Sequence, residues 1–198
     1  PARVTPVELF FDLIFVFAVT QLSHTLLEDL SGQGLFQAGL LVLAMWWQWI
    51  NTSWVTNWLD PGRMAVRVAL FVIMFFGMIF AAAIPHAFAE TGLVLAIAYA
   101  AMLVGRPSFM LWAVRGEPVM RANFQRIISW DVVSAALWIA GGLSEGGARL
   151  GFWAAALAIE SAGPSLYFWT PWLGRSAIGD WDIEGGHMAE RCGLFVII

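Results

Sequence analysis

Long apolar segments separated by short polar connections run along the whole chain. Seven such segments are apparent, over residues 7–27, 35–58, 65–84, 93–114, 124–143, 151–169 and from about 185. An α-helix rises about 1.5 Å per residue, so about 20 apolar residues cross the roughly 30 Å hydrocarbon core of a bilayer. The pattern therefore predicts an all-α, polytopic transmembrane helical bundle of about seven spans, the last of them truncated.

The connections between these segments are short and rich in turn-forming residues, as in residues 31–34, 60–62 and 144–147. Short links favour antiparallel neighbours packed in one bundle. Because no linker divides the chain, we expect a single transmembrane domain over residues 1–198. The chain stops inside the apolar run 193–198, so we expect it to be a fragment of a longer membrane protein.

Composition supports a membrane protein and excludes several other classes. Hydrophobic residues make up 60% of the chain and charged residues 12%, whereas a soluble domain carries about 25% charged residues. The absence of a basic patch argues against nucleic acid as a partner. The single cysteine, Cys192, has no partner for an internal disulfide, and no Cys/His cluster has zinc spacing. We therefore expect the lipid bilayer as the main partner, with no metal and no cofactor.

The distribution of arginines predicts the orientation, because cytoplasmic loops retain positive charge. With the N-terminus and the even-numbered connections taken as one side, seven arginines lie there and Arg149 alone lies on the other. The N-terminus is therefore expected in the cytoplasm. The seven are Arg3, Arg63, Arg67, Arg115, Arg121, Arg126 and Arg175.

Two carboxylates interrupt the first apolar segment. Glu8 and Asp12 are four residues apart, so a helix places them on one face, one turn from each other. An ionised carboxylate at bilayer depth costs several kcal/mol, so such groups usually face a bundle interior or a wet cavity. The pair therefore indicates the inward face of this helix and is a candidate ion or proton site.

Acidic groups outnumber basic ones within the segments, five to two. They are Glu8, Asp12, Arg106, Asp131, Glu160, Glu190 and Arg191. Unpaired charge at that depth is too costly to sustain, so some carboxylates are expected to be protonated, hydrated or matched by a bound cation. All except Glu160 fall in the cytoplasmic half. Two interpretations stay open, an ion-pair network that fixes helix register and a path for a proton or an ion.

Two local patterns add to this picture. His187, Glu190 and Arg191 share one helix face, which suits an ion-pair cluster at a helix end or a proton relay. Glu160 lies near the middle of its predicted segment, with Pro164 four residues later. Because proline has no N–H, the carbonyl of residue 160 loses its helical partner. Broken helices near the midplane coordinate ions and substrates in transporters, which makes Glu160 the best single functional candidate.

The sequence resembles the bacterial low temperature requirement A family along its whole length. The opening segment 4–17, Val-Thr-Pro-Val-Glu-Leu-Phe-Phe-Asp-Leu-Ile-Phe-Val-Phe, resembles the N-terminal signature of that family. Segments 56–61, 160–164 and 187–198 agree in order. The resemblance implies a bacterial inner-membrane protein connected with growth at low temperature, and it supplies no substrate. The positions it draws attention to are Glu8, Asp12, Glu160, His187, Glu190 and Arg191.

The leading hypothesis is a multi-pass protein that moves a proton, a cation or a small solute through an acidic intramembrane site. The alternative is a non-transporting membrane sensor or scaffold involved in cold growth or envelope homeostasis. An enzyme is not expected, because the chain has no Ser/His/Asp spacing, no His-Glu-x-x-His motif and no glycine-rich phosphate loop.

Overall fold

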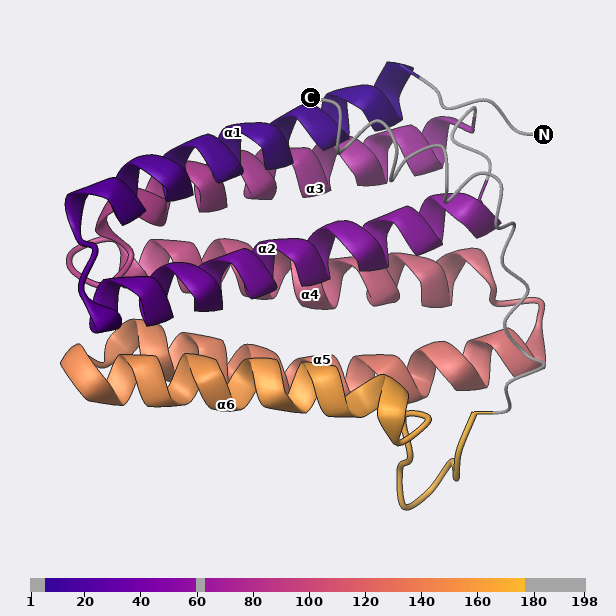
Figure 1. Cartoon of the computed structure of the whole chain (residues 1–198). Helices are drawn as coiled ribbons and strands as arrows, with labels where there is room; N and C mark the ends of the chain where they lie inside the picture. The colour runs from indigo at the N-terminus through magenta and orange to yellow at the C-terminus, as the bar shows by residue number, and fades with distance from the viewer. Residues whose placement is uncertain (1–5, 60–62, 177–198) are drawn as a thin grey trace. The chain divides into compact units, whose positions relative to one another are not determined.

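The computed structural model describes residues 6–59 and 63–176, where all regular structure is helical apart from an isolated bridge between Thr170 and Gly174. Six α-helices and a short 3-10 turn follow one another along the described chain (Figure 1). Their bounds are α1 (Pro6–Glu28), α2 (Gly32–Trp58), α3 (Met64–Ala83), η1 (Ile84–His86), α4 (Gly92–Ala113), α5 (Pro118–Leu143) and α6 (Gly146–Ser165).

The all-helical fold class is confirmed and the first six predicted segments are helical, whereas a count of seven spans is not supported. The seventh segment lies outside the described residues. Four helical segments are long and apolar enough to cross a membrane, Leu9–Glu28, Met64–His86, Gly92–Ala113 and Pro118–Leu143. The other two helices are less apolar, because α2 carries several indole and amide side chains and α6 carries glycines, an arginine and a glutamate.

Helix α3 has the composition of a helix surrounded by lipid and protein. Its buried face includes Leu70 and Met74, and its exposed face is equally apolar, with Phe71 and Phe75 each more than half exposed. A helix that is hydrophobic all round belongs in a membrane or in the core of a large protein. The four apolar helical segments and the composition of α3 therefore fit a membrane protein.

The contacts of the chain divide it into two compact units, which are described separately here. Unit 1 comprises residues 1–85 and 183–198, and unit 2 comprises residues 86–182. The described part of unit 1 holds α1, α2 and α3, and that of unit 2 holds α4, α5 and α6. The single transmembrane domain expected from the sequence stays a prediction.

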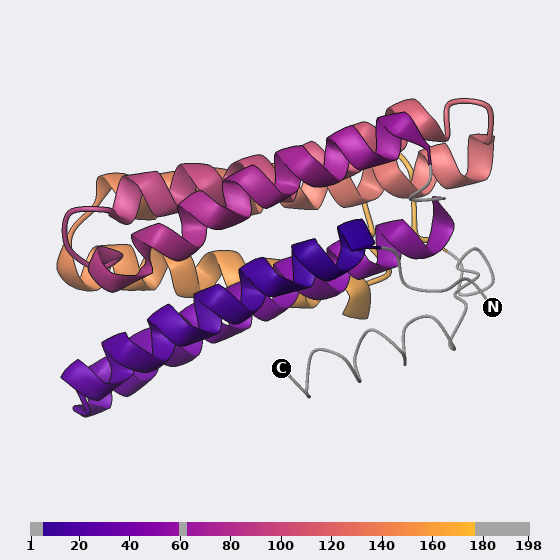
Figure 2. The same ribbon diagram turned by 90° about the horizontal axis from the view of Figure 1, so that it is seen from above.

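In unit 1, α1 packs against both α2 and α3, and Figure 2 shows α1 lying along α2. The start of α2 is fixed by side-chain capping. Ser31 Oγ accepts a hydrogen bond from the Gly34 N–H at 3.1 Å, and Asp29 Oδ1 accepts one from the Ser31 N–H at 3.0 Å. These bonds satisfy N–H groups that have no partner inside the helix, so the chain reverses sharply between α1 and α2.

In unit 2, α5 packs against both α4 and α6 (Figure 1). Two adjacent glycines near the end of α5 allow this close approach. A Cβ on Gly141 would lie 2.5 Å from Nε1 of Trp153 on α6, and one on Gly142 would lie 2.8 Å from Cβ of Ala96 on α4. Small residues at helix interfaces let neighbouring backbones approach in this way. The three helices consequently hold the side chains of the candidate site in fixed positions.

Candidate functional site

Three hydrogen-bond donors from two other helices converge on the carboxylate of Glu160. Oε2 of Glu160 accepts a hydrogen bond from the Tyr99 hydroxyl at 2.6 Å. Oε1 accepts two, from Ser134 Oγ at 2.5 Å and from Trp138 Nε1 at 2.9 Å. Glu160 is only 3% exposed, and all three donors are fully buried. An ionised carboxylate is acceptor-only, so this set of donors satisfies both of its oxygens.

An aromatic column positions two of these donors. The ring centroids of Tyr99 and Trp138 lie 4.2 Å apart, and those of Trp138 and Trp153 lie 5.1 Å apart. Trp153 Nε1 also donates to the backbone carbonyl of Trp138 at 3.0 Å. Because all three rings are fully buried and in contact with one another, the hydroxyl and the indole N–H that reach Glu160 have little freedom to turn away.

Arg106 on α4 and Asp131 on α5 belong to the same cluster. Both are buried, and each interacts electrostatically with the other and with Glu160. Oδ2 of Asp131 accepts no hydrogen bond from the residues that the structure describes. The guanidinium of Arg106 therefore interacts electrostatically with two buried carboxylates of unit 2. We call Arg106, Asp131 and Glu160, with the donors Tyr99, Ser134 and Trp138, the acidic cluster.

Arg149 is buried in the first turns of α6, about three helical turns before Glu160. Its Nε donates to the carbonyls of Gly141 and Ser144 at 3.3 and 2.9 Å. Its Nη1 donates to those of Ala87 and Ala89 at 2.9 and 2.8 Å. The arginine that the sequence placed alone at one end of the bundle therefore binds carbonyls at the end of α5 and in the segment before α4.

The segment after α6 holds the end of that helix against α5. Leu166 N–H donates to the carbonyls of Ala162 and Gly163, and two following residues adopt positive φ, which is uncommon for residues other than glycine. Arg126 on α5 donates from Nε and Nη2 to the carbonyl of Leu173 at 3.0 and 2.6 Å. Trp130 Nε1 donates to the Trp169 carbonyl at 3.1 Å. These bonds fix the C-terminal turns of α6, in which Glu160 lies.

Glu160 does not lie at a midhelix break, contrary to the expectation from Pro164. Helix α6 begins and ends earlier than the apolar pattern predicted, and it ends at Ser165, directly after the proline. Pro164 therefore occupies the last turn, where the Leu166 N–H donates to the carbonyls of Ala162 and Gly163. The loss of the helical partner of the Glu160 carbonyl stays a prediction, and the hydrogen bonds described above reach the side chain of Glu160.

In unit 1, Asp12 of the predicted pair is fully buried and accepts a hydrogen bond from Trp49 Nε1 at 2.8 Å. This bond joins α1 to α2. The side chain of Glu8 lies outside the part of the structure that is described, and so do His187, Glu190 and Arg191. Of the predicted ion-pair network, Arg106 and Asp131 are therefore the members whose placement is known.

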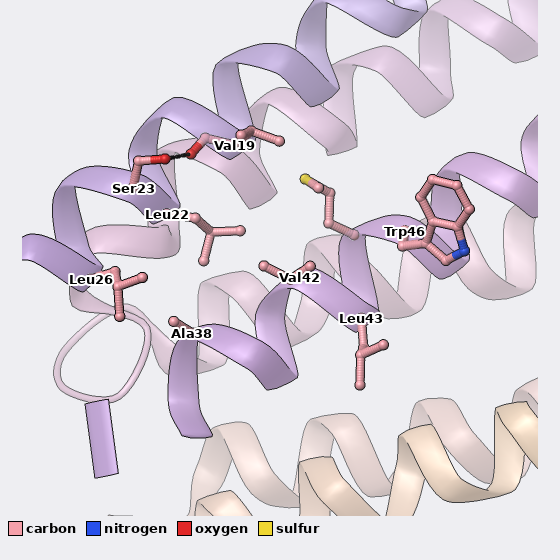
Figure 3. A pocket seen from close by; sticks show the side chains of 9 residues that line it. Val19, Leu22, Ser23, Leu26, Ala38, Val42, Leu43 and Trp46 are labelled. Atoms are coloured by element: carbon pink, nitrogen blue, oxygen red, sulfur yellow. Dashed lines mark hydrogen bonds between the residues drawn. The ribbon is translucent and has the colours of Figure 1, made fainter. Parts of the chain in front are cut away.

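A second feature of unit 1 is an apolar groove of about 500 Å³ between α1 and α2 (Figure 3). Leu22 and Leu26 of α1 face Ala38 and Val42 of α2 across it. The hydroxyl of Ser23 is turned away from ligand binding, because it donates to the Val19 carbonyl at 2.9 Å. A groove with this lining offers no polar anchor, so it does not suit a charged or polar solute.

Asp29 lies between α1 and α2, where its carboxylate accepts a hydrogen bond from the Ser31 N–H. Hydrogen bonds from the side chain and then the backbone N–H of Ser31 lower the pKa of Asp29 below its ordinary value. The carboxylate is therefore held in its charged form at the start of α2, where the helix dipole also favours negative charge.

The sequence did not identify Tyr99, Ser134 and Trp138 as partners of Glu160, although a signal for two of them was present. Asp131, Ser134 and Trp138 recur at i, i+3 and i+7, so they share one face of α5. A stripe of polar side chains along an otherwise apolar helix marks an inward face. Which helix this face meets depends on tertiary packing, and the sequence pattern contains no information about that.

Comparisons with known proteins agree with the resemblance seen in the sequence. The family described as bacterial low temperature requirement A protein (LtrA) matches residues 3–198. An uncharacterized protein of Rhizobium meliloti (strain 1021) is 47% identical over 192 residues, which cover 96% of this chain and 47% of the relative. The chain thus spans about half the length of that relative, and no solved structure matches it. The chain belongs to the bacterial low temperature requirement A family.

Proposed function

We propose that the chain is part of a bacterial inner-membrane protein that moves a proton, a cation or a small solute through the acidic cluster of unit 2. One observation carries the proposal. Two carboxylates, Asp131 and Glu160, are buried in unit 2, whose helices α4 and α5 are apolar enough to cross a membrane, and the buried Arg106 acts on both carboxylates. Ionisable groups inside membrane helices are rare because they are costly, and they mark ion pathways and proton relays.

A flux assay on the full-length protein in liposomes tests this proposal. Internal dyes for pH, Na⁺ and K⁺ report which ion crosses the bilayer under an imposed gradient. We expect Glu160→Gln to reduce flux strongly, because the substitution removes the negative charge while keeping the shape of the side chain. The exposed Glu145→Gln in the same unit is the matched control and should transport normally. Undiminished flux in Glu160→Gln would remove Glu160 from the mechanism.

A second candidate is a non-transporting sensor or scaffold connected with growth in the cold or with the envelope. The interhelical hydrogen bonds favour it, since the donors to Glu160 come from α4 and α5 and join all three helices of unit 2. On this alternative, neutralising Arg106 lowers stability and the intact protein moves no ion. Neither candidate assigns an enzymatic activity to the protein.

We also propose that the N-terminus and the arginine-rich end of unit 2 face the cytoplasm. Arg115 and Arg121 flank the connection between α4 and α5, and Arg175 follows α6 at the same end of the unit. Gly116 in that connection is exposed. With Cys192 replaced by serine, a Gly116→Cys variant should react with an impermeant maleimide only after the cells are permeabilised. Labelling in intact spheroplasts would contradict this orientation and indicate the opposite one.

A further inference from the structure

We infer that the species bound by the acidic cluster is a proton, that Asp131 is the residue that takes it up, and that Glu160 remains a fixed carboxylate. This inference rests on the proposed function and narrows its cargo. It also assigns the binding and release of the proton to Asp131 on α5 and not to Glu160 on α6. Three properties of the cluster lead to it: the polarity of the groups around Glu160, the vacant oxygen of Asp131, and the charge balance with Arg106.

The hydrogen bonds around Glu160 direct hydrogens at its carboxylate, whereas a metal cation needs lone pairs directed at itself. Tyr99, Ser134 and Trp138 each direct a hydrogen at the carboxylate, over 2.6, 2.5 and 2.9 Å. An indole N–H has no lone pair to offer to a cation. Na⁺, K⁺ or Ca²⁺ would need several converging oxygen lone pairs. Within the described ranges, no group of three or more His, Cys, Asp or Glu side chains is placed to hold a metal ion.

Asp131 differs from Glu160 in one decisive respect. Its side chain is only 6% exposed, yet its Oδ2 meets no donor among the described residues. A buried carboxylate oxygen without a donor is costly when charged. A proton placed on that carboxyl group removes the charge without requiring any new ligand. Glu160 therefore has the hydrogen-bond donors that a permanently charged carboxylate needs. Asp131 has an oxygen without a donor, and this oxygen can bind the proton.

One added proton brings the net charge of the cluster to zero. Asp131 and Glu160 contribute two negative charges and Arg106 one positive charge, all buried in unit 2. A proton from the aqueous phase joins the Asp131 carboxylate to give a neutral carboxylic acid, and within the cluster the charges of Arg106 and Glu160 then balance each other. The reverse step returns the proton to the aqueous phase. No other reactant is needed, and the tyrosine, serine and indole donors keep their hydrogens throughout.

Infrared difference spectroscopy of the full-length protein in liposomes tests this assignment directly. The difference between spectra recorded at low and at high pH should contain the C=O stretching band of a buried carboxylic acid. This band shifts in D₂O. We expect the band to be absent from Asp131→Asn and to remain in Glu160→Gln. The exposed Asp29→Asn is the control and should leave it unchanged. If Asp131→Asn does not fold, a band that remains both in Glu160→Gln and in a variant of the other buried carboxylate, Asp12→Asn, still supports Asp131. A band that Glu160→Gln alone abolishes overturns the inference.

The flux assay separates this inference from the proposed function. Proton flux that continues when choline replaces external Na⁺ and K⁺, and that Asp131→Asn abolishes, supports both. Flux that requires Na⁺ or K⁺ supports an acidic transport site and overturns the proton as its cargo. If the infrared band is assigned to Asp131 while no ion crosses the bilayer, proton binding stands and the transport proposal fails.

Discussion

Removing the hydroxyl of Tyr99 is the sharpest perturbation of the acidic cluster. Tyr99→Phe keeps the ring and its stacking on Trp138 at 4.2 Å, and it deletes only the 2.6 Å bond to Glu160 Oε2. Hydrogen bonds between membrane helices average about 0.6 kcal/mol and reach about 1.7 kcal/mol. Bonds to a charged group are worth about 1.5–3 kcal/mol. The two ranges meet near 1.5 kcal/mol, so the unfolding equilibrium should shift about tenfold toward the unfolded state.

The measurement is unfolding of the full-length protein in mixed micelles with increasing SDS, followed by tryptophan fluorescence. The chain contains only two tyrosines, and the other supplies a matched control. Tyr167 follows α6 and is 41% exposed, so Tyr167→Phe should change stability by less than about 0.5 kcal/mol. If both variants unfold at the same SDS fraction as the parent, the Tyr99 bond does not hold Glu160 in place and the geometry of the cluster is wrong.

The remaining predictions concern three substitutions in the helices of unit 2 and one at the start of α2. Gly141→Ala should lower the free energy of unfolding by about 1–3 kcal/mol, because its Cβ meets the buried Trp153 ring. Gly151→Ala, which has open space around it, should raise that free energy by about 0.5–1 kcal/mol, as the same SDS titration would report. Arg149→Lys keeps the charge but loses the planar fork that binds four carbonyls, so thermal unfolding should reveal a loss of about 1–3 kcal/mol. Asp29 has a lowered pKa, so its stabilisation of α2 is present above its ordinary value of 3.8 and is lost as the pH falls below it. Asp29→Asn should therefore flatten the acid limb of the stability–pH profile, and an unchanged limb would contradict the capping role.

Most of the fold was predictable because the apolar pattern is a local property of the sequence. Each helix of the described chain falls within or close to a predicted apolar segment. The ends were less predictable, as α6 illustrates. Pro164 suggested a break in a longer span, but the bonds from Leu166 N–H to Ala162 and Gly163 end the helix there. Those bonds depend on backbone angles that the apolar pattern does not encode.

The candidate site was predictable in part, for a related reason. The cost of burying a carboxylate identified Asp12, Asp131 and Glu160 as inward-facing groups, and the structure places all three in the interior. The partners were not predictable, because Tyr99 lies 61 residues from Glu160 and Trp49 lies 37 residues from Asp12. Which helix faces meet is decided by packing, including the contact that Gly142 allows between α5 and α4.

The most direct test of the account is proton flux into liposomes that contain the full-length protein. An internal dye reports the pH, and choline replaces Na⁺ and K⁺ in the external buffer. The account predicts that the interior acidifies faster than in protein-free liposomes and that Asp131→Asn abolishes the difference. Equal rates for the parent protein and protein-free liposomes, or full flux in a folded Asp131→Asn variant, would contradict it.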